Sequence, residues 1–390
     1  MKLIPFRPYT FRDSISRSAS PPFDTINEEL AEELRKEPTN IVNITIPLEN
    51  GIPPSAILKK WLEDGTLKRI DKDSYIGIIQ EFKYNETPLR RLGLIGLVEI
   101  FPDDGNVRPH EETFEKPLQG RFELMKEING QPEPIFMLVS SNKFERVLAR
   151  ALAEGEEIFD FEEPIGVVNR VIQISSPETV AEISKSLEGE SAIVADGHHR
   201  LGATRRLAAL NPNNPFWSSC MSYISSVHDS GLLIAGIHRV VKKKLNLQDY
   251  LGKISDRFNV EEITSFNGQE SMVLYDGSQR YLKISPKSIP EEYPEKFRSS
   301  IVPLTYVLNE LLFRECLGFN DLDISDLVEY QHDLYHAVKS VENGEASFAV
   351  LMPYWNKNSF IQFVINGDTL PPKSTYFYPK IPSGIAINLP

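Results

Sequence analysis

Two adjacent histidines lie in the segment IVADGHHRLGATRR (residues 193–206), between an Asp-Gly pair and a run of basic residues. The residues SAIVA (191–195) form a short apolar run with β-branched side chains, whereas RLGATRRLAAL (200–210) has the composition and apolar spacing of a helix. This order predicts a strand, a tight turn and a helix. Asp196 to His199 would then form the start of that helix.

The start of such a helix is suited to binding an anion. Its first backbone N–H groups have no partner within the helix, Gly197 allows close approach, and His198, His199 and Arg200 add hydrogen-bond donors. Phosphate is the anion that this set favours. Taken singly, Asp196 is more simply explained as an N-cap and Arg200 as a solvated helix residue. Two neighbouring histidines, however, point about 100° apart on a helix and rarely serve one packing role.

The composition is that of a globular protein with an acidic balance. The chain has 390 residues, enough for two or three domains, and 41% of them are hydrophobic. The 42 Lys and Arg residues against 55 Asp and Glu residues give a formal net charge of −13. This charge disfavours nucleic acid and anionic membranes as partners but leaves room for small anions in a local basic pocket. The P-loop spacing G-x-x-x-x-G-K-[ST] does not occur in the sequence.

The two cysteines, Cys220 and Cys316, stand in unrelated contexts without metal-ligand spacing, so we expect reduced thiols, no disulfide and no zinc site. Residues 1–24 lack the apolar run of a signal peptide, and no later run has the length that spans a bilayer. We therefore expect a cytoplasmic protein.

Alternating hydrophobic periodicities indicate a mixed α/β protein. The expected helices are residues 27–37, 55–67 and 118–128, and the expected strands are 40–47, 75–84, 91–101 and 134–140. Residues 222–241 are expected to form two strands joined by a turn at 229–231. Charged helices and short strands are expected from about residue 244 onward.

The segments PHEE (109–112) and DGHHR (196–200) together carry a resemblance to a known family. Along the chain come PHEE, then Arg121, then a strand beginning at Pro134, and finally DGHHR at the start of a helix. This order resembles the free serine kinases of the ParB/sulfiredoxin-like superfamily. Sulfiredoxin itself needs a cysteine where this chain has His198, and the ParB proteins carry Gly-Glu-Arg-Arg and DNA-binding helices, so the sequence argues against both.

The likeness is closer still to a family of longer relatives marked by ADGHHR, and it then covers nearly the whole chain. Its other marks are PPFDTI (21–26), NIVNITIP (40–47), WLEDGTL (61–67), HEETF (110–114), GIHRVV (236–241) and PPKSTYFYPK (371–380). Members of that family are implicated as pyrophosphate-dependent kinases of free L-serine, whereas short archaeal relatives use ADP or ATP. The resemblance therefore implies an enzyme that makes O-phospho-L-serine, feeds serine and cysteine metabolism and uses Mg²⁺.

The resemblance also implies an α/β (α+β) fold with a ParB/sulfiredoxin-like kinase core at residues 96–240. An N-terminal α/β region (1–95) would precede this core. A C-terminal α/β region (241–390) would follow it and complete the phosphate site.

Phosphoryl transfer needs positive charge around the phosphate and usually a carboxylate that receives the proton of the acceptor hydroxyl. Residues 197–200 would hold the phosphate, and Asp196 would orient a histidine or bind Mg²⁺. By the resemblance, Glu111 or its neighbour Glu112 is the base, and His110 and Glu112 contact the substrate. Which of the two glutamates acts is left open by the sequence.

A second phosphate clamp is expected in KSTYFYPK, because pyrophosphate carries more charge than one helix terminus neutralises. Lys373, Ser374 and Thr375 are its expected members, and Arg239 is a weaker candidate for the same duty. The alternative is a strand that buries its aromatic residues and leaves its lysines solvated.

Two functions of different classes fit these observations. One is a kinase of free serine or another small hydroxyl compound, with pyrophosphate, ADP or ATP as donor. The other is a non-catalytic sensor that binds a phosphorylated metabolite or nucleotide in the same anion site. The sequence leaves the donor and the oligomeric state open.

Overall fold

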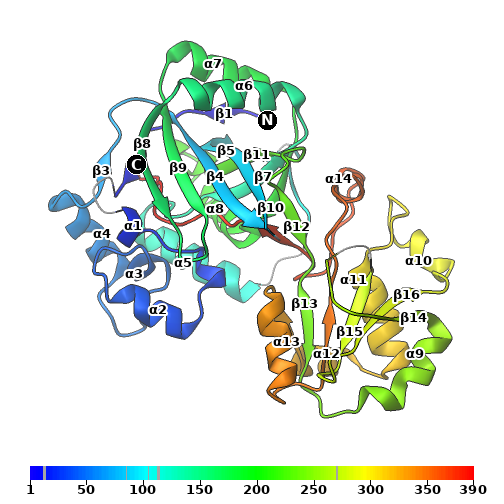
Figure 1. Ribbon diagram of the computed structural model, residues 1–390. Coiled ribbons are helices and arrows are strands. Elements are labelled where there is room, and N and C mark those ends of the chain that lie inside the picture. Colours follow the sequence, from blue (N-terminus) through cyan, green and yellow to red (C-terminus); the bar gives the residue numbers. More distant parts are fainter. Residues whose placement is uncertain (12–14, 85, 104, 112–114, 269–270) are drawn as a thin grey trace. The chain divides into compact units, whose positions relative to one another are not determined.

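The computed structural model of the chain describes residues 1–390 except 12–14, 85, 104, 112–114 and 269–270 (Figure 1). The chain divides into two compact units. Unit 1 comprises residues 1–109, 113–232 and 379–390, and unit 2 comprises residues 110–112 and 233–378. This division differs from the three regions expected from the sequence: the expected boundary at residues 95 and 96 falls inside a strand, and the last residues of the chain belong to unit 1.

Unit 1 is built on a mixed sheet. Among the described residues this sheet has nine strands, in the order β6-β10-β7-β11-β5-β4-β9-β8, with β1 paired to β5. The strands are β1 (Leu3–Ile4), β4 (Tyr75–Tyr84), β5 (Thr87–Glu99), β6 (Val107–Pro109), β7 (Ile135–Val139), β8 (Glu156–Glu162), β9 (Val168–Ile174), β10 (Ala192–Asp196) and β11 (Ser219–Ser226). The pairs β6–β10 and β7–β11 are parallel and the other pairs are antiparallel. A small separate sheet pairs β2 (Tyr9–Thr10) with β3 (Lys68–Arg69).

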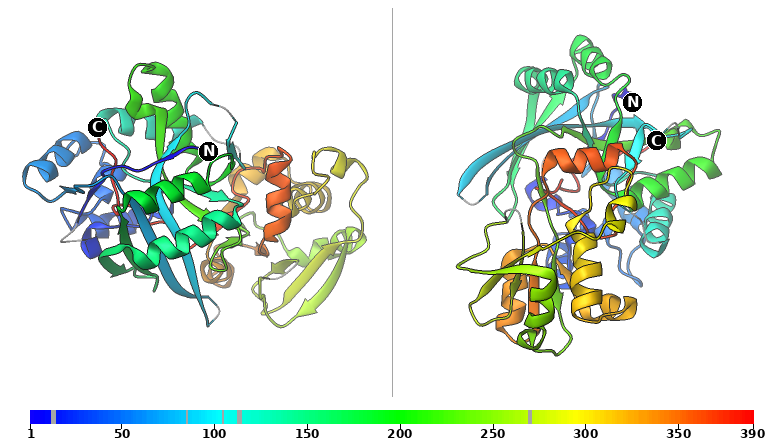
Figure 2. Two further views of the ribbon diagram at one scale, coloured as in Figure 1. Left: turned by 90° about the horizontal axis from the view of Figure 1, so that it is seen from above. Right: turned by 90° about the vertical axis from the view of Figure 1, so that its right-hand side faces the viewer.

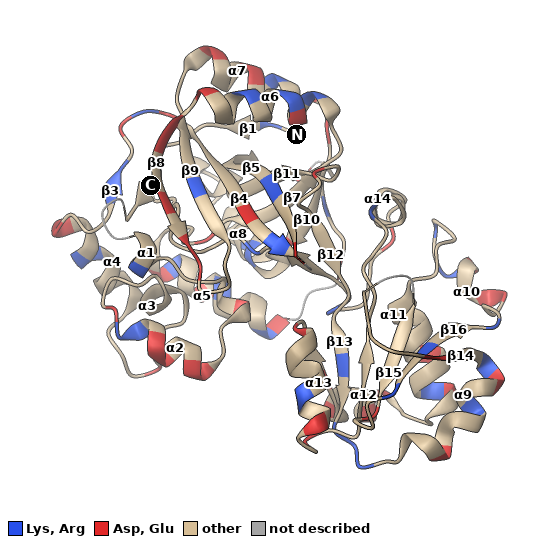
Figure 3. Cartoon of the chain, in the orientation of Figure 1, with Lys and Arg blue, Asp and Glu red and all other residues tan. Residues whose placement is uncertain are grey.

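Helices surround this sheet. They are α1 (Ile15–Ser18), η1 (Phe23–Thr25), α2 (Glu28–Arg35), α3 (Val42–Thr45), α4 (Pro54–Glu63), α5 (Glu115–Ile128), α6 (Asn142–Glu154), α7 (Pro177–Ser186), α8 (His198–Leu210) and η2 (Pro215–Ser218). Helices α6 and α7 lie side by side over one face of the sheet (Figures 1 and 2). Gly77 on β4 permits this packing, because a Cβ there would lie 2.2 Å from the Leu152 side chain of α6. Charged residues of both signs occur along α6, as expected for a helix with one solvated side (Figure 3).

The C-terminal segment, residues 379–390, is built into unit 1. The backbone of Ile387 exchanges two hydrogen bonds with Tyr9, each 2.9 Å long, and Asn388 pairs in the same way with Gln131. The side chain of Ile387 is buried. The two ends of the chain are therefore joined in one core, and residues near the C-terminus are held beside elements from the first half of the chain.

Unit 2 contains an antiparallel sheet in the order β14-β16-β15-β18-β13-β17 and the separate pair β12–β19. Its strands are β12 (Leu233–Ala235), β13 (His238–Val241), β14 (Phe258–Ile263), β15 (Met272–Tyr275), β16 (Tyr281–Pro286), β17 (Val328–Gln331), β18 (Phe348–Leu351) and β19 (Tyr376–Tyr378). Its helices are η3 (Leu247–Tyr250), α9 (Leu251–Arg257), α10 (Glu292–Glu295), α11 (Leu304–Val307), the π-helical segment η4 (Leu308–Cys316), α12 (Asp321–Leu327), α13 (Leu334–Glu342) and α14 (Lys357–Ile365). Two apolar cores pack on this sheet, one with α9 and η4 and one with α13.

The mixed α/β class is confirmed, and most elements expected in the first half of the chain are present. The strand expected at residues 40–47 is wrong, because those residues contain helix α3. The Asn40 side chain explains the difference: its oxygen accepts a hydrogen bond from the N–H of Val42 (3.0 Å), and its nitrogen donates to the carbonyls of Arg17 and Ala19. Asn40 therefore fixes a helical turn where composition alone favours a strand.

The two-stranded hairpin expected at residues 222–241 is also absent. The turn exists, since the Asp229 carboxylate accepts a hydrogen bond from the Gly231 N–H (2.8 Å), but its other oxygen binds the N–H of Leu92 on β5. Strand β11 belongs to unit 1, whereas β12 pairs with β19 in unit 2. The turn thus marks the passage of the chain from one unit to the other.

No helix among the described residues is long and apolar enough to cross a membrane. Both cysteines are buried free thiols. Burial raises the pKa of Cys220 to about 12, so its thiol stays protonated at neutral pH.

The buried C-terminal segment generates a test. Replacement Ile387→Ala should lower the free energy of unfolding of unit 1 by about 2–5 kcal/mol, because it leaves a cavity in the core. Hydrogen exchange of peptides from β4 and β5 in increasing urea measures this. The control is Ile165→Ala in the same unit, at a side chain that is 63% exposed, and it should change little. Equal effects would show that the segment is not part of the core.

Candidate functional site

The start of helix α8 has the geometry of an anion-binding helix terminus. Gly197 is its N-cap and adopts a left-handed conformation with φ of 87°. A Cβ at this position would lie 3.0 Å from the guanidinium of Arg200, so the turn requires glycine on both grounds. Because glycine has no side chain, the N-cap does not itself occupy the N–H groups of the first turn. Residues 196–199 are half-buried here.

Arg200 points inward, although the sequence predicted it as a phosphate ligand. Its side chain is 8% exposed, and its terminal nitrogens donate to the Pro134 carbonyl (2.5 Å) and to Asp196 Oδ2 (3.2 Å). Arg200 thereby ties α8 to the start of β7. Its Nε is buried without a hydrogen-bond partner in the described part of the chain. A buried donor of this kind is costly unless a bound group satisfies it.

Lys380, from the C-terminal segment, meets the same carboxylate. Its Nζ lies 3.4 Å from Asp196 Oδ1, and both side chains are largely buried. Burial alone would raise the pKa of Asp196, but the charges of Lys380, Arg200 and His198 outweigh it and lower the pKa to about 2. Asp196 is therefore a carboxylate at any physiological pH.

Three further charged residues belong to this group. The guanidinium of Arg121 lies over the Phe23 ring, 3.9 Å from its centroid, and its Nη1 is 3.9 Å from Glu133 Oε2. Glu133 is buried; its Oε1 accepts a hydrogen bond from Ser383 Oγ, while its Oε2 makes no hydrogen bond to the described residues. Desolvation by the surrounding protein raises the pKa of Asp24, and the charge of Asp196 raises it further, while the charges of Lys380 and Arg200 oppose the effect.

We name this group the α8 cluster. Its members are Asp24, Arg121, Glu133, Asp196, Gly197, His198, His199, Arg200 and Lys380. Of these, the sequence-based site omitted Asp24, Arg121, Glu133 and Lys380. A signal was present for three of them, because Arg121 stands in the motif order that follows PHEE, Asp24 lies in PPFDTI and Lys380 ends PPKSTYFYPK. Nothing in the local sequence marks Glu133.

Glu111 lies in unit 2, at a turn formed by residues 371–375. Its Oε1 accepts a hydrogen bond from the N–H of Lys373 (2.7 Å), and its Oε2 accepts one from the N–H of Ser374 (3.4 Å). Lys373 has a φ of 62°, a left-handed conformation that turns these two N–H groups toward one acceptor. The backbone N–H groups of Lys373 and Ser374, which belong to the expected phosphate clamp, thus bind the Glu111 carboxylate. We call this arrangement the Glu111 turn.

The side chains of the expected clamp make hydrogen bonds within unit 2. Ser374 is buried, and its hydroxyl donates to the Pro371 carbonyl (2.7 Å). Thr375 Oγ1 lies 2.7 Å from Nε2 of His110, which is itself buried. These hydroxyls and His110 are therefore bonded within unit 2, where the sequence placed them on phosphate and substrate. The Lys373 side chain is exposed.

Arg239 on β13 is close enough to Glu111 for their charges to interact. Its side chain is buried, its Nη1 donates to the Ile237 carbonyl (2.5 Å), and its guanidinium lies 4.6 Å from the centroid of the Tyr330 ring. Burial lowers the pKa of Arg239 to about 10, although the Tyr330 hydroxyl and the Glu111 carboxylate offset part of the effect. Arg239 is thus the buried cation near the Glu111 turn.

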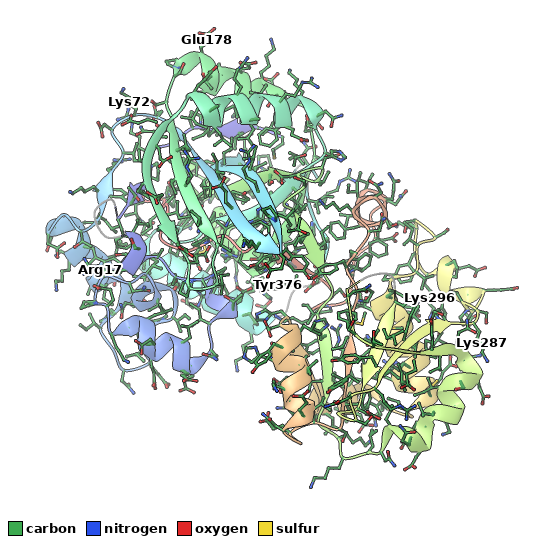
Figure 4. All side chains as sticks on the ribbon, viewed as in Figure 1. Arg17, Lys72, Glu178, Lys287, Lys296 and Tyr376 are labelled. Atoms are coloured by element: carbon green, nitrogen blue, oxygen red, sulfur yellow. The ribbon has the colours of Figure 1, made fainter. Side chains whose placement is uncertain are left out.

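The structure therefore divides the predicted site residues between two groups. Asp196, Gly197, His198, His199 and Arg200 lie in unit 1, and His110, Glu111, Arg239, Lys373, Ser374 and Thr375 lie in unit 2. Figure 4 labels Tyr376, the first residue of β19, which directly follows the second group. Glu112 lies outside the described residues.

Comparison with known proteins places the chain in a family. Residues 3–307 match the model of a family described as Protein of unknown function (DUF1015). The chain belongs to this family. No curated protein matches the sequence.

Several solved structures are distantly similar. A conserved hypothetical protein from Pyrococcus furiosus is 16% identical with a TM-score of 0.36, over 73% of this chain and 92% of that one. SbnI with a C-terminal truncation, from Staphylococcus aureus, is 11% identical with a TM-score of 0.40, over 76% and 87%. A free serine kinase in complex with AMP is 15% identical with a TM-score of 0.39, over 73% and 89%.

The ion pair of Asp196 predicts a measurable titration. Replacement Lys380→Met should raise the pKa of Asp196 from about 2 toward its ordinary value of 3.8, because it removes the first of the opposing charges. Since the folded-state pKa is lowered, the stability that these charges give the fold is present above pH 3.8 and is lost as the pH falls toward 2. In Lys380→Met this loss should be smaller and should be complete at a higher pH, because the folded-state pKa then lies closer to 3.8. Carboxyl ¹³C NMR follows the titration.

The matched control is Lys2→Met, which removes a lysine from an exposed pair with Glu99 (2.8 Å). It should leave the Asp196 resonance unchanged. An unchanged Asp196 titration in Lys380→Met would refute the ion pair.

Proposed function

We propose that this protein is a phosphotransferase that uses pyrophosphate to convert free L-serine into O-phospho-L-serine. The observation that carries the proposal is the start of helix α8, where a glycine N-cap, two half-buried histidines and the buried, unsatisfied Nε of Arg200 bring several hydrogen-bond donors together. The choice of serine and of pyrophosphate rests on the motif resemblance. The α8 cluster supports phosphate as the bound group.

In this proposal the first turn of α8, with His198 and His199, binds the transferred phosphoryl group. The serine Oγ forms a bond to phosphorus, the bond from phosphorus to the bridging oxygen breaks, and orthophosphate leaves with that oxygen. Glu111 accepts the proton of the serine hydroxyl. The hydrogen bonds from Lys373 and Ser374 fix the direction of the Glu111 carboxylate.

The assignment of Glu111 as the base rests on the same resemblance, which the segment PHEE (109–112) carries.

The α8 cluster also contains groups that suit Mg²⁺. Desolvation and the charge of Asp196 raise the pKa of Asp24, and a cation close to both carboxylates would oppose that effect. No group of three or more His, Cys, Asp or Glu side chains in the described part of the chain is arranged to hold a metal. This fits Mg²⁺, which uses one or two carboxylates together with phosphate oxygens and water. When bound, Mg²⁺ would neutralise phosphate charge, with Asp24 and Asp196 as its protein ligands.

One observation favours a nucleotide as the alternative donor. Unit 2 contains a cavity of about 740 Å³ whose lining, as far as the structure describes the chain, consists of uncharged residues; Tyr354 and Trp355 among them offer a surface suited to a purine ring. Trp355 also donates a hydrogen bond from Nε1 to the Ser374 carbonyl (3.3 Å), so the cavity adjoins the Glu111 turn. ADP and ATP are therefore compared with pyrophosphate below.

The first test concerns the reaction and its base. Serine, pyrophosphate and Mg²⁺ should give a phosphomonoester signal in phosphorus NMR with the native protein. Glu111→Gln should reduce turnover about 10²- to 10⁴-fold while phosphate binding is kept, because it removes only the proton acceptor. Glu112→Gln, at its neighbour in the sequence, should change kcat little, because Glu112 is expected to contact the substrate without accepting the proton, and it serves as the comparison.

The opposite result for the two variants would move the role to Glu112. Pyrophosphate binding without any monoester, for serine and for other small hydroxyl compounds, would leave a sensor of phosphorylated metabolites as the function.

The second test concerns the donor. Lys373→Ala should raise the KM for pyrophosphate far more than the KM for serine, because the exposed ammonium faces charge on the phosphate that is not transferred. Lys373→Arg keeps the charge and should stay near the native value. Steady-state assays with each substrate varied in turn provide these constants. Equal or faster turnover with ADP or ATP would refute pyrophosphate as donor.

A further inference from the structure

A buried arginine on β5 is held without a direct ion pair. Arg91 is fully buried, and its Nε and Nη2 both donate to the side-chain oxygen of Gln80, the first over 3.1 Å. Its guanidinium lies over two aromatic rings, 4.8 Å from the centroid of Phe136 and 5.4 Å from that of Tyr223. No salt bridge joins Arg91 to a carboxylate in the described part of the chain. The amide of Gln80 is thus its principal polar partner.

Gln80 lies in the middle of a row of three polar side chains that crosses the sheet. Gln80 stands opposite Arg91 on β5 and opposite Asn169 on β9, so all three side chains share one face. The Gln80 nitrogen donates to Asn169 Oδ1 (3.0 Å), and the Asn169 nitrogen donates to Glu163 Oε1 (2.8 Å). The side-chain amides of Gln80 and Asn169 therefore form a hydrogen-bonded chain that runs from the Arg91 guanidinium to the Glu163 carboxyl group. Burial raises the pKa of Glu163 to about 7, with Asn169 and Arg91 offsetting part of the effect.

The orientation of the Gln80 amide is consequently fixed at both ends. Its oxygen must face Arg91, and its nitrogen must face Asn169. That nitrogen has a second N–H, which donates to the backbone carbonyl of Lys380 over 3.0 Å. The side chain of the same Lys380 forms the ion pair with Asp196. The Gln80 side chain in the sheet interior thus holds the backbone of Lys380, and the ammonium of Lys380 forms the ion pair with Asp196 at the start of α8.

We propose that Gln80 is a positioning residue, oriented by Arg91 and Asn169, that holds Lys380 against Asp196. The local geometry favours this role because Lys380 follows directly on the residues at which the chain enters unit 1 from unit 2. Ser383, three residues on, is held separately by backbone hydrogen bonds to Ser20. Gln80 therefore acts at the beginning of the C-terminal segment, where Lys380 lies.

The test measures the reactivity of the Lys380 amine, which needs no turnover. Gln80→Glu keeps an oxygen for Arg91 but removes both N–H donors, so it releases the Lys380 carbonyl while Arg91 keeps a partner. Acetylation by a limiting amount of an acetylating reagent at pH 8, read by peptide mass spectrometry, should be at least about threefold faster at Lys380 than in the native protein. The rates at the exposed lysines serve as the internal reference.

The matched control is Gln173→Glu. Gln173 is a buried glutamine of the neighbouring strand β9, and its amide nitrogen donates to Ser74 Oγ (3.0 Å), away from Lys380. The Gln173→Glu variant introduces the same carboxyl group and should leave the acetylation rate of Lys380 unchanged. If Gln80→Glu does not fold, Gln80→Asn replaces it, because the shorter amide cannot reach both Arg91 and Lys380. Unchanged Lys380 reactivity in a folded variant, or an equal rise in Gln173→Glu, would overturn the proposal.

A second readout rests on the proposed function. Gln80→Glu should raise the KM for pyrophosphate about tenfold with a smaller change in kcat, because Lys380 affects the charge at the phosphate site and not the proton transfer. Gln173→Glu should alter neither constant. Absence of turnover in the native protein would refute the kinase assignment alone, since the acetylation measurement still decides the role of Gln80. A fall in kcat without any change in KM would overturn the positioning role.

Discussion

The contact of Asp196 with Lys380 and Arg200 determines how the candidate phosphate site is assembled. It joins the end of strand β10, the first turn of helix α8 and the C-terminal segment through one carboxylate. Both cations are largely buried, so the attraction is weakly screened by solvent and salt. The pKa of about 2 for Asp196 expresses the same balance. The C-terminal segment must be folded into unit 1 before the α8 cluster has its full charge.

In both candidate groups a carboxylate of the protein occupies positions that the sequence assigned to phosphate. Asp196 accepts a hydrogen bond from the Arg200 guanidinium, and Glu111 accepts hydrogen bonds from the backbone N–H groups of Lys373 and Ser374. The physical reason is that buried donors need acceptors when no ligand is bound. The half-buried His198 and His199 on α8 and the exposed Lys373 side chain are then the groups that suit an incoming anion. Inward donors orient the site, and half-buried or exposed donors are suited to contact the ligand.

Much of the first half of the fold could be predicted from the sequence, because its elements follow from local patterns. Strand β4 and helix α8 are examples, since apolar runs and helix-forming composition determine both. Helix α3 could not be predicted, because the Asn40 side chain decides it through carbonyls about twenty residues away. The presence of Asp24 and Lys380 in the α8 cluster also depends on long-range packing. Periodicity carries no information on such contacts.

The motifs of this sequence acquire a common explanation in the path of the chain. The chain passes between the units after residues 109, 112, 232 and 378. The motif PHEE spans the first passage, and PPKSTYFYPK spans the last, so the second motif supplies Lys373 to the Glu111 turn and Lys380 to the α8 cluster. Each of these motifs therefore contributes residues to both units. The Glu111 carboxylate stabilises the left-handed conformation of Lys373 by accepting a hydrogen bond from the Lys373 N–H.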